Sequence, residues 1–372
     1  MAATEQGTIL HSLITPDGEL RISLDPFDLP EPGPGEVLVR VEATPVNPSD
    51  LGLLFGAADM ASLRVEEGRL VGSIPEAARP AAAARLGQPL PVGNEGAGTI
   101  VRAGPDLAHL VGRKAAMIGG AMYATHRLVP FAECLLLPED AAAAEGASLF
   151  VNPLTALGFV ETMRAEGHRA IVHSAAASNL GQMLVRICRA DGVPLVNIVR
   201  SEAQVALLRD LGAEHIVDSS APGFDAALVE AIAATGATIG FDAIGGGTLA
   251  GRILAAMETV AARSLRGGYS RYGTDVHKQL YIYGMLDVGP TVFERTFGFA
   301  WSMGGWLLFP FLRKAGAATA ERLRQRVLAE FRTTFASRYT ATIRLADLLN
   351  PDIARACQRK GTGEKYLIDP SR

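Results

Sequence analysis

The sequence has little cysteine. Its 372 residues include three, Cys134, Cys188 and Cys357, and no two of them form a CxxC pair. A disulfide framework or a structural zinc site needs several cysteines at short spacings. The chain lacks the pattern for either, and three scattered cysteines fit a reducing, cytoplasmic environment best.

The sequence also lacks an excess of positive charge and a long apolar run. Its formal net charge of −4 does not favour nucleic acid as a partner. The opening stretch MAATEQGTILHSLITPDGEL has acids and no apolar core, so no signal peptide is predicted. The most apolar stretch, 297–312, is shorter than the ~20 residues of a spanning helix, and glycines and Pro310 interrupt it. We expect no stable membrane insertion, and the stretch favours a pocket wall or subunit interface over a membrane-surface helix.

The sequence is long, and its pattern of predicted secondary structure changes near residue 150. A chain of 372 residues is long enough for two domains, each with its own core. Up to residue 148, Pro, Gly and short β-type runs such as GEVLVRVEATPV (35–46) dominate. We therefore predict a β-rich domain over residues 1–148.

Strands alternate with helices after that point. AIVHSA (170–175) predicts a strand, and the next stretch predicts a helix whose apolar face carries Leu180, Met183, Leu184 and Ile187. Such alternation is typical of parallel βαβ units in a doubly wound α/β fold. We predict a Rossmann-type domain over 149–315 and a C-terminal segment, 316–372, that returns to the first domain.

The turn between that strand and helix resembles a dinucleotide site with few glycines. A pyrophosphate binds at a helix N-terminus, where the backbone must be approachable. Here Ala175, Ala176, Ala177 and Ser178 are small, Asn179 tolerates the left-handed conformation, and Gly181 follows. Taken alone, the turn is equally compatible with an ordinary strand-to-helix corner.

The end of the next strand bears on the choice of cofactor. NAD sites place an acidic residue there to hold the ribose hydroxyl, whereas this chain has Arg200 followed by Ser201. An arginine attracts a 2′-phosphate, so NADP(H) is favoured over NAD(H). The alternative is a solvated arginine at a strand end.

Several motifs together resemble the medium-chain dehydrogenase/reductase superfamily over nearly the full chain. The motifs are PEPGPGEVLVRVEATPVNPSDL, VGNEGAGTIVRAG, NPLTALGF, GFDAIGG, YIYGML and GTGEKYLIDP. Within it, the chain most resembles the zinc-free branch of NADPH:quinone reductases and 2-enoyl thioester reductases, and VNPLTA, AASNLGQ and NIVRSE are most similar to the enoyl reductases. The resemblance implies a GroES-like β domain that holds a Rossmann domain, and a homodimer.

The resemblance also implies roles for individual residues. Asn47 would line the active site, and Tyr123 is a candidate proton donor whose alternative is a packed tyrosine. The residues implied to bind the cofactor are Asn152, Thr155, Ala177, Ser178, Asn179, Leu180, Arg200, Ser201, Tyr283, Gly284, Met285, Phe299, Trp301, Ser302 and Lys365. Among them, Phe299, Trp301 and Ser302 would wall the cleft, and Lys365 would reach the cofactor from the tail.

No metal is predicted. Zinc alcohol dehydrogenases of this superfamily need thiolate and imidazole ligands. Here Asn94 stands where the imidazole is usual, and no cysteine lies near Asn47. Without a Lewis acid, hydride delivery to an electron-poor carbon is favoured over alcohol oxidation. We expect reduction of a quinone or of a carbonyl-conjugated C=C, as in an enone or enoyl thioester.

One departure from the family bears on the substrate. Enoyl reductases of this type usually have a tyrosine about ten residues after NPSD, taken as the proton donor, where this chain has Ala58. Quinone reduction needs no precisely placed acid, so the alanine favours a quinone. The alternative function is an NADPH-binding sensor or structural protein with weak chemistry. Asp50 and Asp242 are interpreted mainly as turn caps and His173 as structural.

Overall fold

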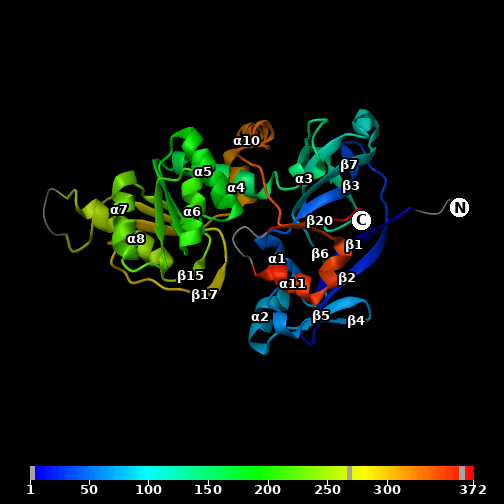
Figure 1. Cartoon of the computed structure of the whole chain (residues 1–372), viewed down its shortest axis with the longest axis horizontal. Helices are drawn as coiled ribbons and strands as arrows, with labels where there is room; N and C mark the ends of the chain where they lie inside the picture. Colours follow the sequence, from blue (N-terminus) through cyan, green and yellow to red (C-terminus); the bar gives the residue numbers. More distant parts are fainter. Residues whose placement is uncertain (1–4, 266–269, 360–364) are drawn as a thin grey trace. The chain divides into compact units, whose positions relative to one another are not determined.

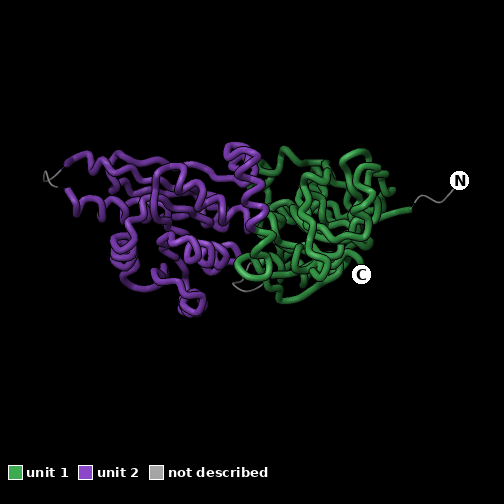
Figure 2. The backbone as a smooth tube through the Cα atoms, turned by 90° about the horizontal axis from the view of Figure 1, so that it is seen from above, with its two compact units in different colours: residues 1–151, 327–372 green, residues 152–326 purple. Residues whose placement is uncertain are grey.

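The computed structural model describes residues 5–265, 270–359 and 365–372 (Figure 1). The chain divides into two compact units (Figure 2): the first comprises Met1–Val151 and Val327–Arg372, and the second comprises Asn152–Arg326. The borders predicted from the sequence were 148/149 and 315/316, whereas the chain leaves the first unit after Val151 and re-enters it after Arg326.

One sheet of the first unit has the strand order β4-β5-β2-β1-β6, with antiparallel neighbours throughout. Its strands are β1 (Gln6–Ile14), β2 (Glu19–Asp28), β4 (Arg64–Glu66), β5 (Arg69–Ser73) and β6 (Leu90–Pro91). In β2, the buried Leu20 and Ile22 flank the exposed Arg21, because successive side chains point to opposite faces of a sheet.

The other sheet of this unit has the order β10-β8-β7-β3-β20-β19, and β9 also pairs with β3. Its strands are β3 (Glu36–Pro45), β7 (Glu95–Ala103), β8 (Lys114–Ile118), β9 (His126–Pro130), β10 (Cys134–Leu136), β19 (Ala341–Arg344) and β20 (Tyr366–Asp369). Strand β20 runs antiparallel to β3, with Leu367 opposite Pro45. The C-terminal segment therefore completes a sheet that the N-terminal segment begins.

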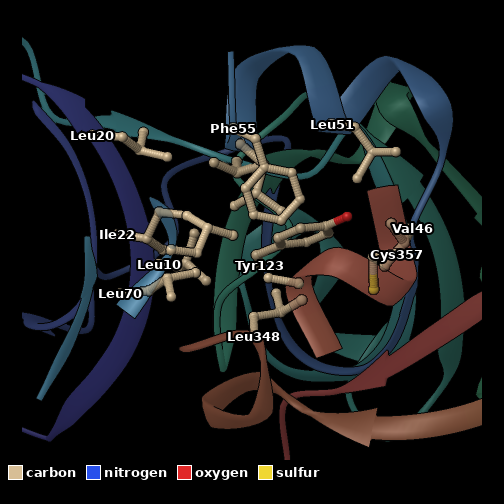
Figure 3. Packing of buried hydrophobic residues seen from close by; sticks show 14 of the residues in the cluster. Leu10, Leu20, Ile22, Val46, Leu51, Phe55, Leu70, Tyr123, Leu348 and Cys357 are labelled. Carbon is tan, nitrogen blue, oxygen red and sulfur yellow. The ribbon is translucent and has the colours of Figure 1, made fainter. Parts of the chain in front are cut away.

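Short helices cover the first unit: α1 (Pro48–Leu54), α2 (Arg79–Ala82), α3 (Ala143–Gly146) and α11 (Pro351–Gln358). Side chains from β1, β2, α1 and the C-terminal segment form a shared apolar core. Figure 3 shows Tyr123 within it, close to Phe55, Leu10 and Leu348. Burial of these side chains stabilises the unit and joins the two ends of the chain.

The second unit is a parallel sheet of order β13-β12-β11-β14-β16-β18. The strands are β11 (Ile171–His173), β12 (Leu195–Val199), β13 (His215–Asp218), β14 (Ile239–Asp242), β16 (Lys278–Ile282) and β18 (Trp301–Gly305). Two short strands, β15 (Gly245–Gly247) and β17 (Asp287–Thr291), pair separately. The strand order reverses between β11 and β14, so ligands are expected at the carboxyl ends of these strands.

The helices of this part are α4 (Val151–Ala165), α5 (Asn179–Asp191), α6 (Glu202–Asp210), α7 (Phe224–Thr235), α8 (Leu249–Ala262), α9 (Leu308–Ala315) and α10 (Ala317–Ala329). The predicted apolar face of α5 is confirmed, since Leu180, Met183, Leu184 and Ile187 are all buried. The predicted fold class, a doubly wound parallel sheet with a β-rich second domain, is also confirmed.

One stretch of the described chain, Ala143–Ala165, is long and apolar enough to cross a membrane by length and composition. It spans α3 and α4, and 83% of its most apolar window is buried inside the protein. Such burial is typical of a core helix, in which neighbouring protein surrounds the apolar side chains.

Candidate functional site

The turn between β11 and α5, residues 174–178, has an unusual backbone. Ala175 has a φ of 50°, in the left-handed region that L side chains rarely adopt. Ala176 donates its backbone N–H to Ile198 O at 3.1 Å, which fixes the turn against β12. Strained backbone of this kind gathers at binding sites. Here it lies at the switch point of the sheet, where a ligand is expected.

The head of α5 comes close to this turn because Gly181 has no side chain. A Cβ at Gly181 would lie 2.2 Å from Ala176 O, a distance that no real side chain tolerates. Ser178 caps the helix by accepting a hydrogen bond from the Gly181 N–H at 3.1 Å. The Ser178 hydroxyl can still donate its own hydrogen, because a hydroxyl both accepts and donates. Ala177 and Leu180 are buried, so they offer a ligand backbone rather than side chain.

Arg200 and Ser201 follow β12, the strand beside β11. The Arg200 side chain is exposed, while its backbone N–H donates to Gln204 Oε1 at 2.9 Å. Ser201 caps α6 by accepting a hydrogen bond from the Gln204 N–H at 3.4 Å. Arg200 and Ser201 thus follow a strand that ends at the same sheet edge as the turn at 174–178.

Asp242 ends β14 on the other side of β11 and is fully buried. Its Oδ1 accepts from Ser174 Oγ at 2.6 Å and from the Ile244 N–H at 2.9 Å, and its Oδ2 accepts from the Gly245 N–H at 3.2 Å. The structure therefore favours the turn-capping interpretation of Asp242. Its hydrogen bond with Ser174 also fixes the side chain of the first residue of the turn at 174–178.

Tyr283, Gly284 and Met285 follow β16 at this same edge. The Tyr283 hydroxyl lies 2.7 Å from His173 Nε2, and the Met285 side chain is 75% exposed. A Cβ at Gly284 would meet Ala243 O at 2.5 Å, so the glycine permits a close passage of two backbones. These three residues follow the strand that pairs with β14.

Phe299, Trp301 and Ser302 are not part of this edge, which corrects the prediction that they wall the same cleft. Strand β18 runs parallel to β16, with Trp301 opposite Lys278 and Gly305 opposite Ile282. Trp301 and Ser302 therefore stand at the amino end of the sheet, whereas the turn stands at the carboxyl end. Ser302 Oγ donates to Gln279 Oε1 there, and Phe299 is 74% exposed.

Trp306, which follows β18, lies at the carboxyl edge. Its backbone N–H donates to Ile282 O at 2.9 Å, and its indole N–H donates to Thr162 Oγ1 at 3.0 Å. The ring meets Phe159 edge to face at 4.8 Å. Thr155 and Asn152 are buried on the same helix, α4, one and two turns before Phe159 respectively.

The first unit holds a buried polar cluster around Asn47. Asn47 donates its backbone N–H to Asp50 Oδ2 and its side-chain N–H to Glu95 Oε1, each at 2.8 Å. Asn94 donates both its backbone and side-chain N–H to Asp50 Oδ1. Within the described residues, the buried Asn47 Oδ1 has no hydrogen-bond partner. An acceptor of this kind is costly to leave unpaired, so it is suited to a ligand donor.

Lys365 lies in the same buried cluster. Its ammonium donates to Ser148 Oγ at 2.9 Å, and the side chain is largely buried. Burial lowers the pKa of Lys365 to about 8, although the negative charges of Glu95 and Asp50 oppose this change. The lysine thus supplies a positive charge close to two carboxylates inside the first unit.

Burial also changes the pKa values of Asp50 and Glu95, the two acids of this cluster. It raises the pKa of Asp50 to about 7, against the hydrogen bonds from Asn47 and Asn94. It raises the pKa of Glu95 as well, against the charge of Lys365 and the N–H groups of Val151 and Phe150. Burial thus opposes the charged form of both acids in the cluster. Perturbed groups of this kind are typical of functional sites.

Tyr123 is fully buried, and its hydroxyl donates to Pro45 O at 3.3 Å. Burial raises the pKa of Tyr123 well above its ordinary value. The structure therefore favours the packed-tyrosine alternative over the proton donor. Ala58 packs against the same apolar core. Across the described residues, no group of three or more His, Cys, Asp or Glu side chains could hold a metal ion.

No protein-family model matches the chain. Among curated proteins, the mitochondrial enoyl-[acyl-carrier-protein] reductase of Xenopus tropicalis is 26% identical over 208 residues. The match covers 53% of this chain and 51% of that enzyme. The chain thus spans about half the length of the enoyl reductases that it matches.

Solved structures match over the whole chain. A protein from Mesorhizobium loti, provisionally described as an NADPH:quinone reductase, is 26% identical, with a TM-score of 0.73 and full coverage of both chains. The complex of Etr1p with NADP and crotonyl-CoA has a TM-score of 0.66 at 17% identity, over 98% of this chain and 100% of that one. At that identity, the second likeness concerns the fold.

Proposed function

Because its relatives and structural neighbours are enoyl reductases and NADPH:quinone reductases, the zinc-free branch of the medium-chain dehydrogenase/reductase superfamily, we propose that this chain is an NADPH-dependent oxidoreductase. The resemblance stated from the sequence motifs is confirmed by these relatives. The proposed substrate is a quinone or a C=C conjugated to a carbonyl, in an enone or an enoyl thioester.

The observation that carries the proposal is the sheet edge of the second unit. There, the strained turn at Ala175 leads into the capped head of α5, and Arg200 stands exposed after the neighbouring strand. A helix head with small residues fits a pyrophosphate, and an arginine in place of an acid fits a 2′-phosphate. The residues present therefore fit NADPH.

Each part of the edge has a proposed task. Ser178 and the backbone of residues 177–180 would hold the pyrophosphate, and Arg200 with Ser201 would hold the 2′-phosphate. Tyr283, Gly284 and Met285 would border the nicotinamide half, and Asn152 with Thr155 would lie near it. When bound, NADPH supplies a hydride.

The polar cluster of the first unit is the proposed substrate side. Asn47 Oδ1 would accept a hydrogen bond from a ligand, because it lacks a partner within the described part of the chain. A hydroxyl or N–H group of the ligand would donate to this oxygen, and that bond would orient the ligand in the site. Asp50 positions Asn47 through the 2.8 Å bond from the Asn47 backbone N–H.

The test is NADPH oxidation with a panel of quinones, enones and enoyl thioesters, together with NADPH binding by calorimetry. We expect binding, and turnover of at least one substrate class. Binding without turnover of any member would contradict the proposal. That outcome would support the second candidate function, an NADPH-binding sensor or structural protein, which the burial of Tyr123 and the presence of Ala58 favour.

We also propose a cytoplasmic homodimer. Strand β18 ends the sheet of the second unit, and Phe299, Met303, Leu307 and Phe309 around it expose large apolar surfaces. Exposed apolar patches on a sheet edge favour contact with a second copy. Analytical ultracentrifugation tests the dimer, and a concentration-independent monomer mass would contradict it.

A further inference from the structure

Three exchangeable groups stand in line inside the first unit. Lys365 Nζ lies 2.9 Å from Ser148 Oγ, and Ser148 Oγ lies 2.9 Å from the Tyr339 hydroxyl. Lys365 and Ser148 are buried, whereas Tyr339 is only half-buried. The three groups are therefore joined in order from the buried acid cluster outward, with hydrogen-bond distances at both steps.

The chemistry of the three groups suits proton transfer. An ammonium can donate three hydrogens, and each hydroxyl can accept one hydrogen bond while donating another. Lys365 donates one hydrogen bond to Ser148, and the hydroxyls of Ser148 and Tyr339 can exchange donor and acceptor roles. A proton lost by Lys365 can thus be replaced through Ser148 from Tyr339, and Tyr339 can recover one from solvent.

The inner end of the line meets the proposed substrate side. Glu95 and Asp50 place negative charge near the Lys365 ammonium. Glu95 accepts from Asn47 and from the backbone N–H groups of Phe150 and Val151, which fixes the position of its carboxyl group. Asn47 also carries the unpartnered oxygen proposed above as a ligand acceptor. Lys365 therefore belongs to the same buried cluster as this unpartnered acceptor.

We propose that Lys365 is the proton donor for reduction of a conjugated C=C, and that Ser148 and Tyr339 form the relay that reprotonates it. This rests on the proposed function. In the reaction, the substrate β-carbon gains a hydride, and the π-bond electrons move onto the carbonyl oxygen as an enolate. The α-carbon then takes a proton from Nζ, which leaves a neutral amine. A proton passes from Tyr339 through Ser148 to that amine, and solvent replaces it.

This proposal gives the chain an acid in spite of Ala58. It also accounts for a lysine kept inside the protein at a desolvation cost, since burial lowers its pKa to about 8. Near neutral pH, such a lysine is mostly protonated and can still give up its proton readily, which is what general acid catalysis requires. The groups facing it are Glu95 from β7, Asp50 from α1 and Tyr339 from the segment before β19.

The competing explanation is that Lys365 and Ser148 only attach the C-terminal segment. Thr340 offers a matched control, because its Oγ1 accepts the backbone N–H of Lys365 at 3.1 Å without joining the line of exchangeable groups. Thr340→Val weakens the attachment and leaves the relay complete. Ser148→Ala interrupts the relay, Ser148→Thr keeps a hydroxyl, and Tyr339→Phe removes the outer hydroxyl.

The experiment compares enone with quinone turnover, because hydroquinone anions take protons from water. We expect Ser148→Ala and Tyr339→Phe to lower the enone-to-quinone ratio of kcat about tenfold or more. Ser148→Thr and Thr340→Val should keep the wild-type ratio. In the wild type, kcat for the enone should fall as the pH rises through about 8, because only the ammonium donates. Equal ratios in all variants would overturn the relay.

A readout without substrate completes the test. Nitrogen-15 NMR of the Lys365 ammonium follows its titration in the free protein. Ser148→Ala removes an acceptor that stabilises the charged form, so the pKa of Lys365 should fall, and an unchanged titration would overturn the proposal. A wild type that reduces quinones alone would overturn it too. A wild type that binds NADPH and reduces neither class would instead defeat the proposed function.

Discussion

The Tyr283 hydroxyl lies 2.7 Å from His173 Nε2, with the two rings stacked at 5.8 Å. The bond joins the last residue of β11 to the residue after β16 and so crosses β14. Within the described residues, His173 Nδ1 has no partner, so the bond at Nε2 is the hydrogen bond that the buried ring makes there. The pair thus links the carboxyl ends of β11 and β16, which belong to the proposed cofactor edge.

Removing the Tyr283 hydroxyl should therefore destabilise the fold. Tyr283→Phe leaves both nitrogens of a fully buried imidazole unpaired, which costs about 1–3 kcal/mol of unfolding free energy. Urea unfolding measures the loss. Tyr272, which is 59% exposed, supplies the control, and Tyr272→Phe should change little. Equal effects of the two substitutions would show that the hydrogen bond adds no stability.

His173 should also make stability depend on pH. Burial lowers the pKa of His173 to about 3, whereas an unfolded histidine titrates near 6.5. Below 6.5 the unfolded chain binds a proton that the folded chain refuses, so this stability is complete above 6.5 and is lost as the pH falls towards 3. Replacing His173 by Gln removes this loss. The cost of His173→Gln should thus be smaller at pH 5 than at pH 7.5 by about 2 kcal/mol, measured by urea unfolding at both values.

Arg200 should select the phosphorylated cofactor. Arg200→Ala removes a charged partner of the 2′-phosphate, so the Kd for NADPH should rise about tenfold or more, because charge-assisted bonds contribute about 1.5–3 kcal/mol. The Kd for NADH should change little. Arg209, exposed at the other end of α6, gives a matched loss of charge, and Arg209→Ala should leave both values unchanged. Calorimetry decides, and equal losses for both cofactors would contradict the assignment.

Gly181 should tolerate no side chain. In Gly181→Ala the new Cβ would meet the backbone carbonyl of Ala176, so helix and turn must move apart. We expect a loss of about 1–3 kcal/mol in unfolding free energy, together with weaker NADPH binding. Gly52 lies in α1 with open space around it, and Gly52→Ala should stabilise by about 0.5–1 kcal/mol. Thermal unfolding of both variants tests the contrast.

The sequence was sufficient for the parts that local pattern determines. The apolar face of α5 and the strand-helix alternation predict the parallel sheet, and this in turn predicts that the Ser178 turn and Arg200 share an edge. The position of each tryptophan in 297–312 could not be predicted, because the sequence of this apolar run does not determine how it aligns with a neighbouring strand. Pairing with β16 sets the register, and it selects Trp306 rather than Trp301 for the carboxyl edge.

Long-range polar contacts were equally hidden from the sequence. Ser148 and Tyr339 are 191 residues apart, and neither lies in a motif that indicates a bond between them. The Asn47 side chain is oriented by its hydrogen bond to Glu95, which lies 48 residues away at the start of β7. Only the pairing of β20 with β3 brings the C-terminal segment to these groups.

A buried ion pair between Lys278 and Glu258 should control both stability and its pH dependence in the second unit. Glu258 also accepts the backbone N–H and the hydroxyl of Thr274, and Lys278 is fully buried. Lys278→Met leaves a carboxylate without its cation, which costs about 3–5 kcal/mol. The double variant Glu258→Gln with Lys278→Met should lose less, because no charge then stays buried.

The pH dependence gives the sharper test of this pair. Burial would raise the pKa of Glu258, but the bonds from Lys278 and Thr274 outweigh it and lower the pKa below the usual 4.5. A carboxyl with a lowered pKa stabilises the fold above 4.5, and this stability is lost as the pH falls through the folded value. In Lys278→Met, burial prevails and the pKa rises, so the contribution should reverse and stability should fall as the pH rises above 4.5. Urea midpoints at pH 4 and pH 7 measure the sign, and the same slope in both proteins would show that Lys278 does not hold the charge of Glu258.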